Sequence, residues 1–194
     1  MKLGDLATIR SGLVLSRKQE KKFPEYQYPL LNLRSIHPKG FIEMDKLDVF
    51  QTKNKLNPDY LTQSGDIIIR LSIPYTAVLI DDSTKGFVIS SNFGIIRTNP
   101  EKILPDYLVW LLNTEKITRL IYNNTSGNML SAIHPGFFSS LEIDIPDLED
   151  QNRIAEIYSL SMRELSLIQK LADEKEKYYA AVLNQLQNNI GKDL

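Results

Sequence analysis

The stretch IDIPDLEDQNRIAEIYSLSMRELSLIQ, residues 143–169, changes its hydrophobic period near its middle. Isoleucine alternates with aspartate over residues 143–145, which predicts a strand, and Pro146 ends that pattern. Residues 151–189 then contain neither proline nor glycine, and Gly191 is the kind of residue that commonly follows a helix. The pattern predicts a helix of ~39 residues, which at ~1.5 Å per residue is roughly 58 Å long.

The predicted helix carries an apolar stripe with the spacing of a coiled coil. With Tyr158 at position a of a heptad, the a and d positions are mostly apolar, and polar interruptions at Ser161, Lys175 and Asn189 set register and partner. A small domain cannot cover so long a helix, so we expect the stripe to pack on a partner helix, from a second copy or another protein, parallel or antiparallel, rather than back on its own domain. The predicted dimerisation residues are Tyr158, Leu165, Ile168, Ala172, Tyr179, Val182 and Leu186.

The residues before Pro146 show short strand patterns separated by turn signals, without the alternation of strands and helices of βαβ folds. They predict an α+β fold: a globular domain with short mixed strands and a few helices, followed by one long C-terminal coiled-coil-type helix. We place the domain at residues 1–146 and the helix at 147–194. The predicted elements are a helical turn or short helix at 1–10, strands at 28–36, 67–81 (broken at Pro74), 87–99 (kinked at 90–92) and around 143, a helix at 105–122 and a helical turn at 134–138.

The composition is that of an ordinary globular protein, with 42% hydrophobic residues, and 194 residues suffice for one domain with an extension. The absence of cysteine excludes disulfide bonds, a cysteine zinc site and a cysteine nucleophile. The first residues, MKLGDLATIRSG, lack the apolar segment of a secretory signal, and no apolar run approaches the ~20 residues of a membrane span. We therefore expect a cytoplasmic protein without a membrane partner.

The net charge of −1 hides an uneven distribution along the chain. Residues 1–60 contain 11 Lys/Arg and 7 Asp/Glu, residues 101–150 contain 3 and 8, and residues 151–194 contain 6 of each. A basic first part and an acidic later part are consistent with one face turned toward a polyanion. Chance scatter over a solvated surface is the alternative, and charge alone does not decide between the two.

Sequence patterns for catalysis are missing. The chain contains no GxSxG, Walker-type or GxGxxG motif. Methylation of amino groups on DNA bases needs an Asn/Asp-Pro-Pro-aromatic motif, whereas residues 58–60 and 105–107 both read Pro-Asp-Tyr, and no PD…ExK-type nuclease motif is complete. The two histidines, His37 and His134, each precede a proline in a turn. We therefore expect a chain that is not an enzyme, with no catalytic residue, metal or cofactor.

Side chains suited to DNA binding are more frequent. A basic loop at residues 17–28 interleaves cations with Phe23, Tyr26 and Tyr28, and further cations, serines and asparagines lie at strand ends and turns. Arginine reads guanine and asparagine reads adenine through paired hydrogen bonds, whereas lysine and serine contact phosphates. For each residue alone a solvated surface position is the simpler interpretation, and the sequence does not show which of them converge. The predicted DNA-binding residues are Arg17, Lys18, Lys21, Lys22, Arg34, Lys39, Arg70, Lys85, Ser91, Asn92 and Asn128.

The order of several segments resembles the DNA specificity (S) subunit of type I restriction-modification systems, in a half-subunit form. KLGDLATIRSGL (2–13) is similar to the family's opening segment, and SGDIIIR (64–70) to its Gly-Asp-Ile strand. GFVISSNFGIIRTNP (86–100) and ILPDYLVWLLNT (103–114) resemble a strand and a Pro-x-Tyr-Leu helix, and TSGNMLSAIHPGFFSSLEIDIPDLEDQNRIAEI (125–157) resembles the closing signature that opens a spacer helix. Asp147 replaces the family's usual second proline, and a complete subunit carries two such modules where this chain has one.

The resemblance implies a non-catalytic, sequence-specific DNA-recognition subunit. Its target-recognition domain would read half of a bipartite site in double-stranded DNA. The spacer helix would hold two domains at a fixed distance and dock DNA methyltransferase (modification) subunits, with the restriction/translocase subunit joined indirectly. A chain with one module would act as a homodimer paired through residues 151–189 and would read a palindromic site.

Two alternatives to DNA recognition stay open. One is a non-DNA adaptor protein that uses its coiled-coil helix for assembly, and the other is an orphan nuclease or methyltransferase. DNA affinity that falls with rising salt would distinguish a DNA-binding chain from an adaptor, because phosphate contacts release counterions.

Overall fold

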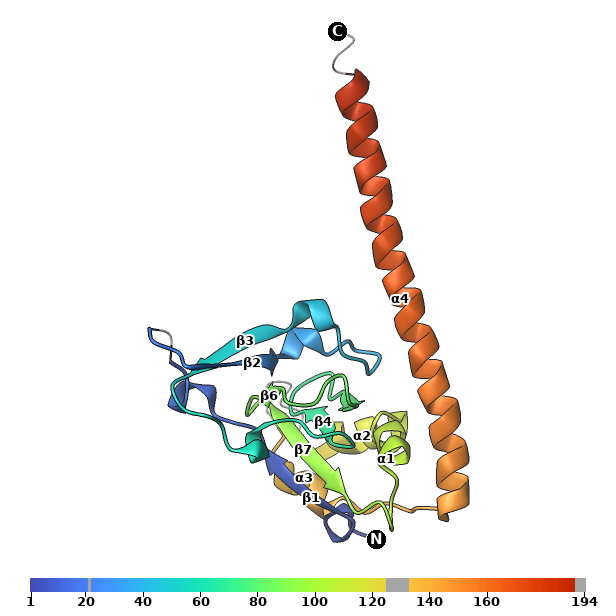
Figure 1. Cartoon of the computed structure of the whole chain (residues 1–194). Coiled ribbons are helices and arrows are strands. Elements are labelled where there is room, and N and C mark those ends of the chain that lie inside the picture. Colours follow the sequence, from blue (N-terminus) through green and yellow to red (C-terminus); the bar gives the residue numbers. More distant parts are fainter. Residues whose placement is uncertain (21, 125–132, 191–194) are drawn as a thin grey trace. The chain divides into compact units, whose positions relative to one another are not determined.

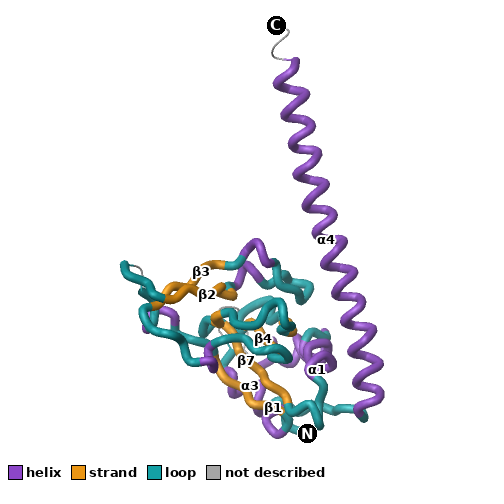
Figure 2. The backbone as a smooth tube through the Cα atoms, in the orientation of Figure 1, coloured by secondary structure: helices purple, strands orange, loops and turns teal. Residues whose placement is uncertain are grey.

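The computed structural model describes residues 1–20, 22–124 and 133–190 (Figure 1). The chain divides into two compact units, Met1–Tyr158 and Ser159–Leu194. The first unit combines two β-sheets with short helices, and a 43-residue helix, α4 (Leu148–Ile190), begins in it and continues through the second (Figure 2). The predicted α+β class and the long C-terminal helix are confirmed.

Two sheets make up the strand content of the first unit. The larger sheet is antiparallel, with the strand order β1-β7-β4-β5. The smaller sheet has the order β3-β2-β6, in which β2 runs antiparallel to β3 and parallel to β6. The strands are β1 (Ala7–Ser11), β2 (Tyr26–Leu31), β3 (Asp48–Thr52), β4 (Ile67–Arg70), β5 (Ala77–Leu79), β6 (Val88–Ile89) and β7 (Phe93–Thr98).

Short helices connect and cover the strands. Pro105 and Pro135 occupy the first helical positions of α1 and α3, where a missing N–H costs no hydrogen bond. The α-helices of this unit are α1 (Pro105–Leu112), α2 (Glu115–Asn124) and α3 (Pro135–Ser140), and the 3₁₀ helices are η1 (Leu3–Asp5), η2 (Leu15–Arg17), η3 (Leu33–Ser35), η4 (Met44–Lys46) and η5 (Pro58–Tyr60).

Strand β4 is buried on both faces and therefore reads as three consecutive isoleucines. Ile67 and Ile69 belong to a core that includes Leu108 of α1. Ile68 points to the opposite face, where it belongs to a second core with Leu31 of β2. The larger sheet is thus packed between the helices and the smaller sheet.

The prediction of a helical turn or short helix over residues 1–10 is largely wrong. Only Leu3–Asp5 is helical, and Ala7–Ser11 pairs antiparallel with β7, so that Ile9 lies opposite Ile96. Apolar residues spaced by three suggested a helix, but pairing with a strand distant in the sequence determines this segment instead.

The helix predicted at 105–122 is two helices that meet at Asn113. The side chain of Asn113 accepts a hydrogen bond from the Ala77 N–H at 2.9 Å and donates one to the Ala77 carbonyl oxygen at 2.8 Å. Since β5 is the last strand of its sheet, Asn113 occupies the place of a further strand at this position. This long-range contact explains a break that the apolar stripe does not indicate.

Two predicted strands are shorter than expected. The strand predicted at 28–36 runs over Tyr26–Leu31 and gives way to η3. The strand predicted around residue 143 is a single bridge between Lys2 and Glu142, where the N–H of Ile143 donates to the Met1 carbonyl oxygen at 2.9 Å. By contrast, the kink predicted at 90–92 is confirmed, and it separates β6 from β7.

The first turns of α4 are bound to the globular unit through one face of the helix. Gln151 is 1% exposed. Its side-chain oxygen accepts a hydrogen bond from the Leu104 N–H at 2.9 Å, and its amide nitrogen donates to the Pro146 carbonyl oxygen at 2.9 Å. Ala155 is buried one turn later, and the Tyr158 hydroxyl accepts a hydrogen bond from the Asn113 amide at 2.8 Å. The compact unit therefore includes three turns of the helix beyond the domain division that we predicted at 146/147.

Replacing Gln151 with alanine is expected to lower the free energy of unfolding by about 2 kcal/mol, because the partly buried Leu104 N–H and Pro146 carbonyl group lose the buried side chain that pairs with them. Urea unfolding followed by circular dichroism measures this difference. Gln187→Ala is the matched control, since Gln187 is exposed on the same helix and its replacement should change the free energy by less than about 0.5 kcal/mol. Equal effects of the two variants would contradict the prediction.

Candidate nucleic-acid interface

Part of the smaller sheet is only two strands wide. Strand β2 pairs with β6 through Leu30 and Leu31, so that among the described residues 26–29 pair only with residues 49–52 of β3. We call these two segments the β2–β3 ribbon. Its inner face is held by Tyr28, half-buried, and Phe50, fully buried, and the Tyr28 hydroxyl accepts a hydrogen bond from the Leu56 N–H at 3.2 Å. The alternate side chains consequently face away from the core.

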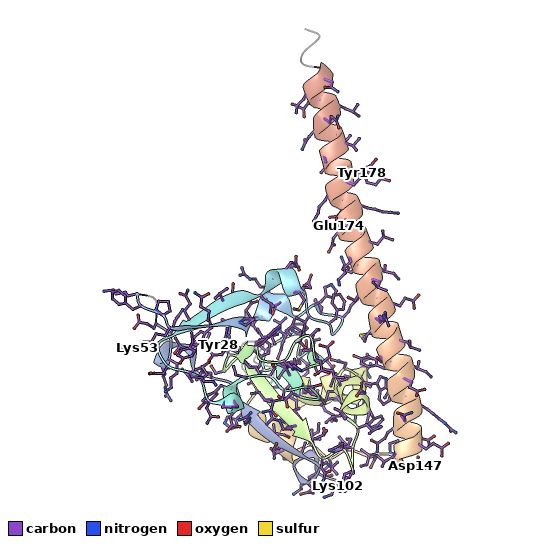
Figure 3. All side chains as sticks on the ribbon, viewed as in Figure 1. Tyr28, Lys53, Lys102, Asp147, Glu174 and Tyr178 are labelled. Atoms are coloured by element: carbon purple, nitrogen blue, oxygen red, sulfur yellow. The ribbon has the colours of Figure 1, made fainter. Side chains whose placement is uncertain are left out.

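The basic loop predicted at residues 17–28 gives way to β2 at Tyr26, and its described residues before that strand lie against the end of this ribbon. The Glu20 N–H donates to the Gln51 carbonyl oxygen at 2.9 Å, and the Glu25 N–H donates to the Thr52 carbonyl oxygen at 3.1 Å. These bonds bring the backbone of the segment that contains Arg17, Lys18 and Lys22 to the end of β3, which Lys53 and Lys55 follow in the chain. Figure 3 labels Lys53 at this end of the strand. Lys21, also predicted to bind DNA, lies outside the described residues.

We call Arg17, Lys18, Lys22, Lys53 and Lys55 the basic tip. All five side chains are exposed, and none of them forms an ion pair with a described residue. Several other cations of the first unit are neutralised, as in the pairs of Arg10 with Asp59 at 3.4 Å and of Arg97 with Asp66 at 2.7 Å. The basic tip is therefore a place where positive charge remains available for a polyanion.

Lys53 and Lys55 are not among the DNA-binding residues predicted from the sequence. The sequence predicts only a short extended piece around residues 41–50 ahead of these lysines, and it gives no sign that they follow a strand next to Arg17, Lys18 and Lys22. A pair of lysines two positions apart, directly after an alternating segment, is the signal that could have indicated a basic strand end.

Arg34 and Lys39 lie in other parts of the fold. Arg34 forms an ion pair with Asp48, which also accepts a hydrogen bond from Asn32 at 2.8 Å. Lys39 is exposed in the turn that His37 stabilises, where His37 Nδ1 accepts the Lys39 N–H at 3.2 Å. The structure does not place either residue in the basic tip.

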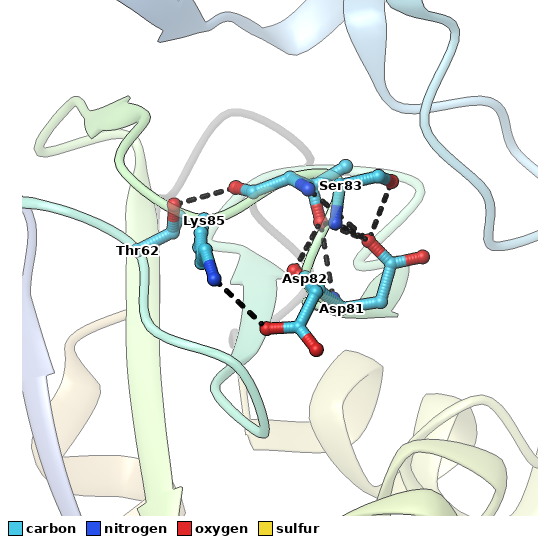
Figure 4. Close-up of polar contacts among 6 residues, drawn as sticks. Thr62, Asp81, Asp82, Ser83 and Lys85 are labelled. Atoms are coloured by element: carbon cyan, nitrogen blue, oxygen red, sulfur yellow. Dashed lines mark hydrogen bonds and ion pairs between the residues drawn. The ribbon is translucent and has the colours of Figure 1, made fainter.

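Lys85 belongs to a turn that is stabilised internally (Figure 4). Its ammonium group lies 3.2 Å from Asp82. Asp81 accepts hydrogen bonds from the Ser83 hydroxyl at 2.7 Å and the Thr84 N–H at 3.1 Å, and the hydrogen bond from Ser83 contributes most to lowering the pKa of Asp81 below its ordinary value. These contacts account for the polar residues of this turn without a ligand.

Arg70, Ser91 and Asn92 meet where β4 ends and β7 begins. The Leu71 N–H donates to the Asn92 carbonyl oxygen at 3.0 Å, and the Ser91 and Asn92 side chains are exposed. Arg70 instead turns inward, where its Nη2 donates to the Ile73 carbonyl oxygen at 3.1 Å and burial lowers its pKa. Arg70 therefore supports the neighbouring loop, whereas Asn128 lies outside the described residues.

The second unit presents an apolar helix face without a partner in the described chain. No residue from 159 to 189 is buried, and Ile168, Tyr179 and Leu186 of the predicted seam are 55%, 59% and 53% exposed. Leu160 and Leu167, which the prediction omitted, are also exposed and widen this face. Tyr158 corrects the prediction, because it packs on the core of its own domain, so the seam begins beyond it.

Among the residues that the structure describes, no three His, Asp or Glu side chains are grouped closely enough for a metal ion. Both histidines make local contacts: the His37 ring stacks on Phe41, and His134 Nδ1 accepts the Gly136 N–H at 3.1 Å. In the same described part, no helix has the length and apolar composition needed to cross a membrane.

Comparison with known sequences identifies a family and two relatives. The type I restriction modification DNA specificity domain matches residues 1–185. The chain is 24% identical over 151 residues to the specificity subunit of the type I restriction enzyme HindI of Haemophilus influenzae, and 24% over 155 residues to that of StySPI of Salmonella potsdam. These matches cover 74% and 78% of this chain but 32% and 33% of the relatives, so the chain spans about a third of their length.

Two solved structures share the fold. One comes from a study of complex assembly and conformational transition of the type I R-M system, with a TM-score of 0.66, and the other is the HsdS subunit from Thermoanaerobacter tengcongensis, with a TM-score of 0.63. Each is 20% identical, and each match covers 91% of this chain and 45% of the solved chain. At this identity the likeness establishes the fold alone.

Proposed function

The chain belongs to the family of type I restriction-modification DNA specificity domains, and on this premise we propose that it supplies sequence recognition to such a system. The family is one of specificity rather than catalytic subunits. The first unit reads one half of a bipartite site in double-stranded DNA. The long helix pairs with that of a second copy and docks DNA methyltransferase subunits, which join the chain to the restriction subunit in the cytoplasm.

The observation that carries this proposal is the extent of the family match. Residues 1–185 include both the globular unit and nearly all of α4, so the likeness is not limited to a fold fragment. The unpaired cations of the basic tip supply the positive charge that phosphate contacts need. The exposed apolar face of α4 supplies a surface for a second helix.

Pairing of two identical chains has a consequence for the DNA site. A two-fold symmetric dimer presents the same recognition surface twice, in opposite directions along the duplex. The two half-sites should therefore have the same sequence in inverted order, separated by a spacer of fixed length.

The test uses the full chain together with the methyltransferase subunit of the same system. We expect modified bases in host DNA, mapped by sequencing, to define one bipartite palindromic motif. The logarithm of the association constant of the complex for a duplex with this motif should fall linearly with the logarithm of the salt concentration. The slope should be about −0.9 for each phosphate that the protein neutralises. An asymmetric motif produced by this chain alone would contradict the homodimer. Affinity without salt dependence, and no modified motif, would contradict DNA recognition and favour the adaptor alternative.

A further inference from the structure

The outer face of the β2–β3 ribbon carries two glutamines opposite each other. The antiparallel register pairs Gln27 with Gln51 and Pro29 with Val49. Directly opposite residues on one face have Cβ atoms about 5 Å apart. Gln27 is exposed and Gln51 is half-buried, so both side chains are accessible to solvent from neighbouring positions on this face.

These amide groups have no task within the described fold. Neither glutamine side chain forms a hydrogen bond with another described residue, whereas Gln151 and Gln169 both do. A glutamine side chain offers a donor and an acceptor together, which is the arrangement that pairs with N6 and N7 of adenine in the major groove. Val49, 63% exposed on the same face, provides an apolar group of the kind that contacts a thymine methyl.

The dimensions of the ribbon also suit the major groove, which is ~12 Å wide and admits a two-stranded ribbon. No third described strand widens the segment of residues 26–29 and 49–52. Asp48, the acidic residue of β3, is on the alternate side of the ribbon and pairs with Arg34. The hydrogen bond from the Glu20 N–H to the Gln51 carbonyl oxygen holds the segment of Arg17, Lys18 and Lys22 at β3. The five cations of the basic tip, which have no ion pair with a described residue, therefore lie at the end of the ribbon, where the phosphates that flank the groove would be.

We propose that the outer face of the β2–β3 ribbon is the base-reading element of this chain, with Gln27 and Gln51 hydrogen-bonding adenine in an A·T pair of the major groove and the basic tip contacting the flanking phosphates. This inference rests on the proposed function and specifies where and how that function is performed. It predicts that the half-site contains at least one A·T pair that the complex requires.

The experiment compares single variants of the full chain in complex with the methyltransferase subunit. For Gln27→Ala and Gln51→Ala we expect a required A·T pair of the motif to become degenerate, with a loss of discrimination at that pair of about 10- to 100-fold. The matched control is Gln63→Ala, an exposed glutamine outside the ribbon, which should leave motif and affinity unchanged. Because the three glutamines are at least partly exposed, thermal unfolding should be the same for all variants.

A second variant separates phosphate contacts from base reading. Lys53→Ala combined with Lys55→Ala should weaken binding to all sequences alike and reduce the salt slope by about 2, without changing the motif. If the wild-type complex has a motif and Gln27→Ala and Gln51→Ala leave it unchanged, or if the half-site contains no required A·T pair, the ribbon proposal is overturned while the proposed function stands. If the wild-type complex shows neither motif nor salt-dependent affinity, the proposed function itself fails.

Discussion

Replacing Arg97 with alanine is expected to lower the free energy of unfolding by about 3 kcal/mol, because it leaves a buried carboxylate without its counter-charge. Asp66 is 1% exposed and accepts two parallel hydrogen bonds from Arg97, from Nε at 2.7 Å and from Nη2 at 2.8 Å. The hydrogen bonds to Asp66 raise the pKa of Arg97, against the burial that lowers it. The pair joins β7 to the turn before β4, where Asp66 also accepts the Gln63 N–H at 2.9 Å.

Denaturant unfolding measures the effect, and Arg119→Ala is the matched control. Arg119 forms an exposed pair with Glu115 in α2 at 2.6 Å, so its loss should cost less than about 0.5 kcal/mol. Adding Asp66→Asn to Arg97→Ala should restore part of the lost stability, since the unpaired charge is then removed. A similar cost for Arg97→Ala and Arg119→Ala would show that Asp66 does not depend on its partner.

Replacing Ile168 and Leu171 with aspartate is expected to raise the dissociation constant of the dimer by at least about 100-fold. Each large apolar side chain that becomes buried contributes about 1.5 to 3 kcal/mol, and the double variant removes two such side chains from each protomer. Ile168 and Leu171 are 55% and 57% exposed in the single chain. Light scattering over a concentration series measures the result, with the wild type as a dimer and the variant as a monomer.

Lys170→Glu is the control for charge, because it also changes the chain by two negative units but lies on the polar side of the helix, between Ile168 and Leu171 in the sequence. The control should remain a dimer. If the double aspartate variant dimerises like the wild type, the dimer interface does not include Ile168 and Leu171. A wild type that is monomeric at every concentration would exclude the symmetric dimer and require a different partner for the helix.

Local sequence patterns were sufficient to predict α4 and β4, because the residues that determine each of these elements are close together in the chain. The absence of proline and glycine after Pro146 was enough for α4, because helix hydrogen bonds connect each residue to one four positions away. The Ser64-Gly65-Asp66 turn followed by three isoleucines was enough for β4. The order of such segments was also enough to indicate the family, which the match over residues 1–185 confirms.

The base-reading and DNA-binding residues remain predictions, and the sequence could not group them because their neighbours are distant in the chain. The segment that contains Lys18 reaches the end of β3 before Lys53 through the hydrogen bond from the Glu20 N–H to the Gln51 carbonyl oxygen. Arg34 and Arg70 look alike in the sequence, but one is neutralised by Asp48 and the other turns inward to Ile73. The partner of each arginine depends on how the whole chain folds, and the sequence near the arginine does not indicate it.

The sequence by itself therefore determined the α+β class, the long helix and the family of this protein, since each rests on local periodicity or on the order of segments. Only the tertiary structure decided that residues 7–11 form a strand, that Asn113 divides a helix, and that Gln27 faces Gln51 beside a cluster of unpaired cations. The physical reason is that backbone pairing and burial between distant segments outweigh local preference wherever the two conflict.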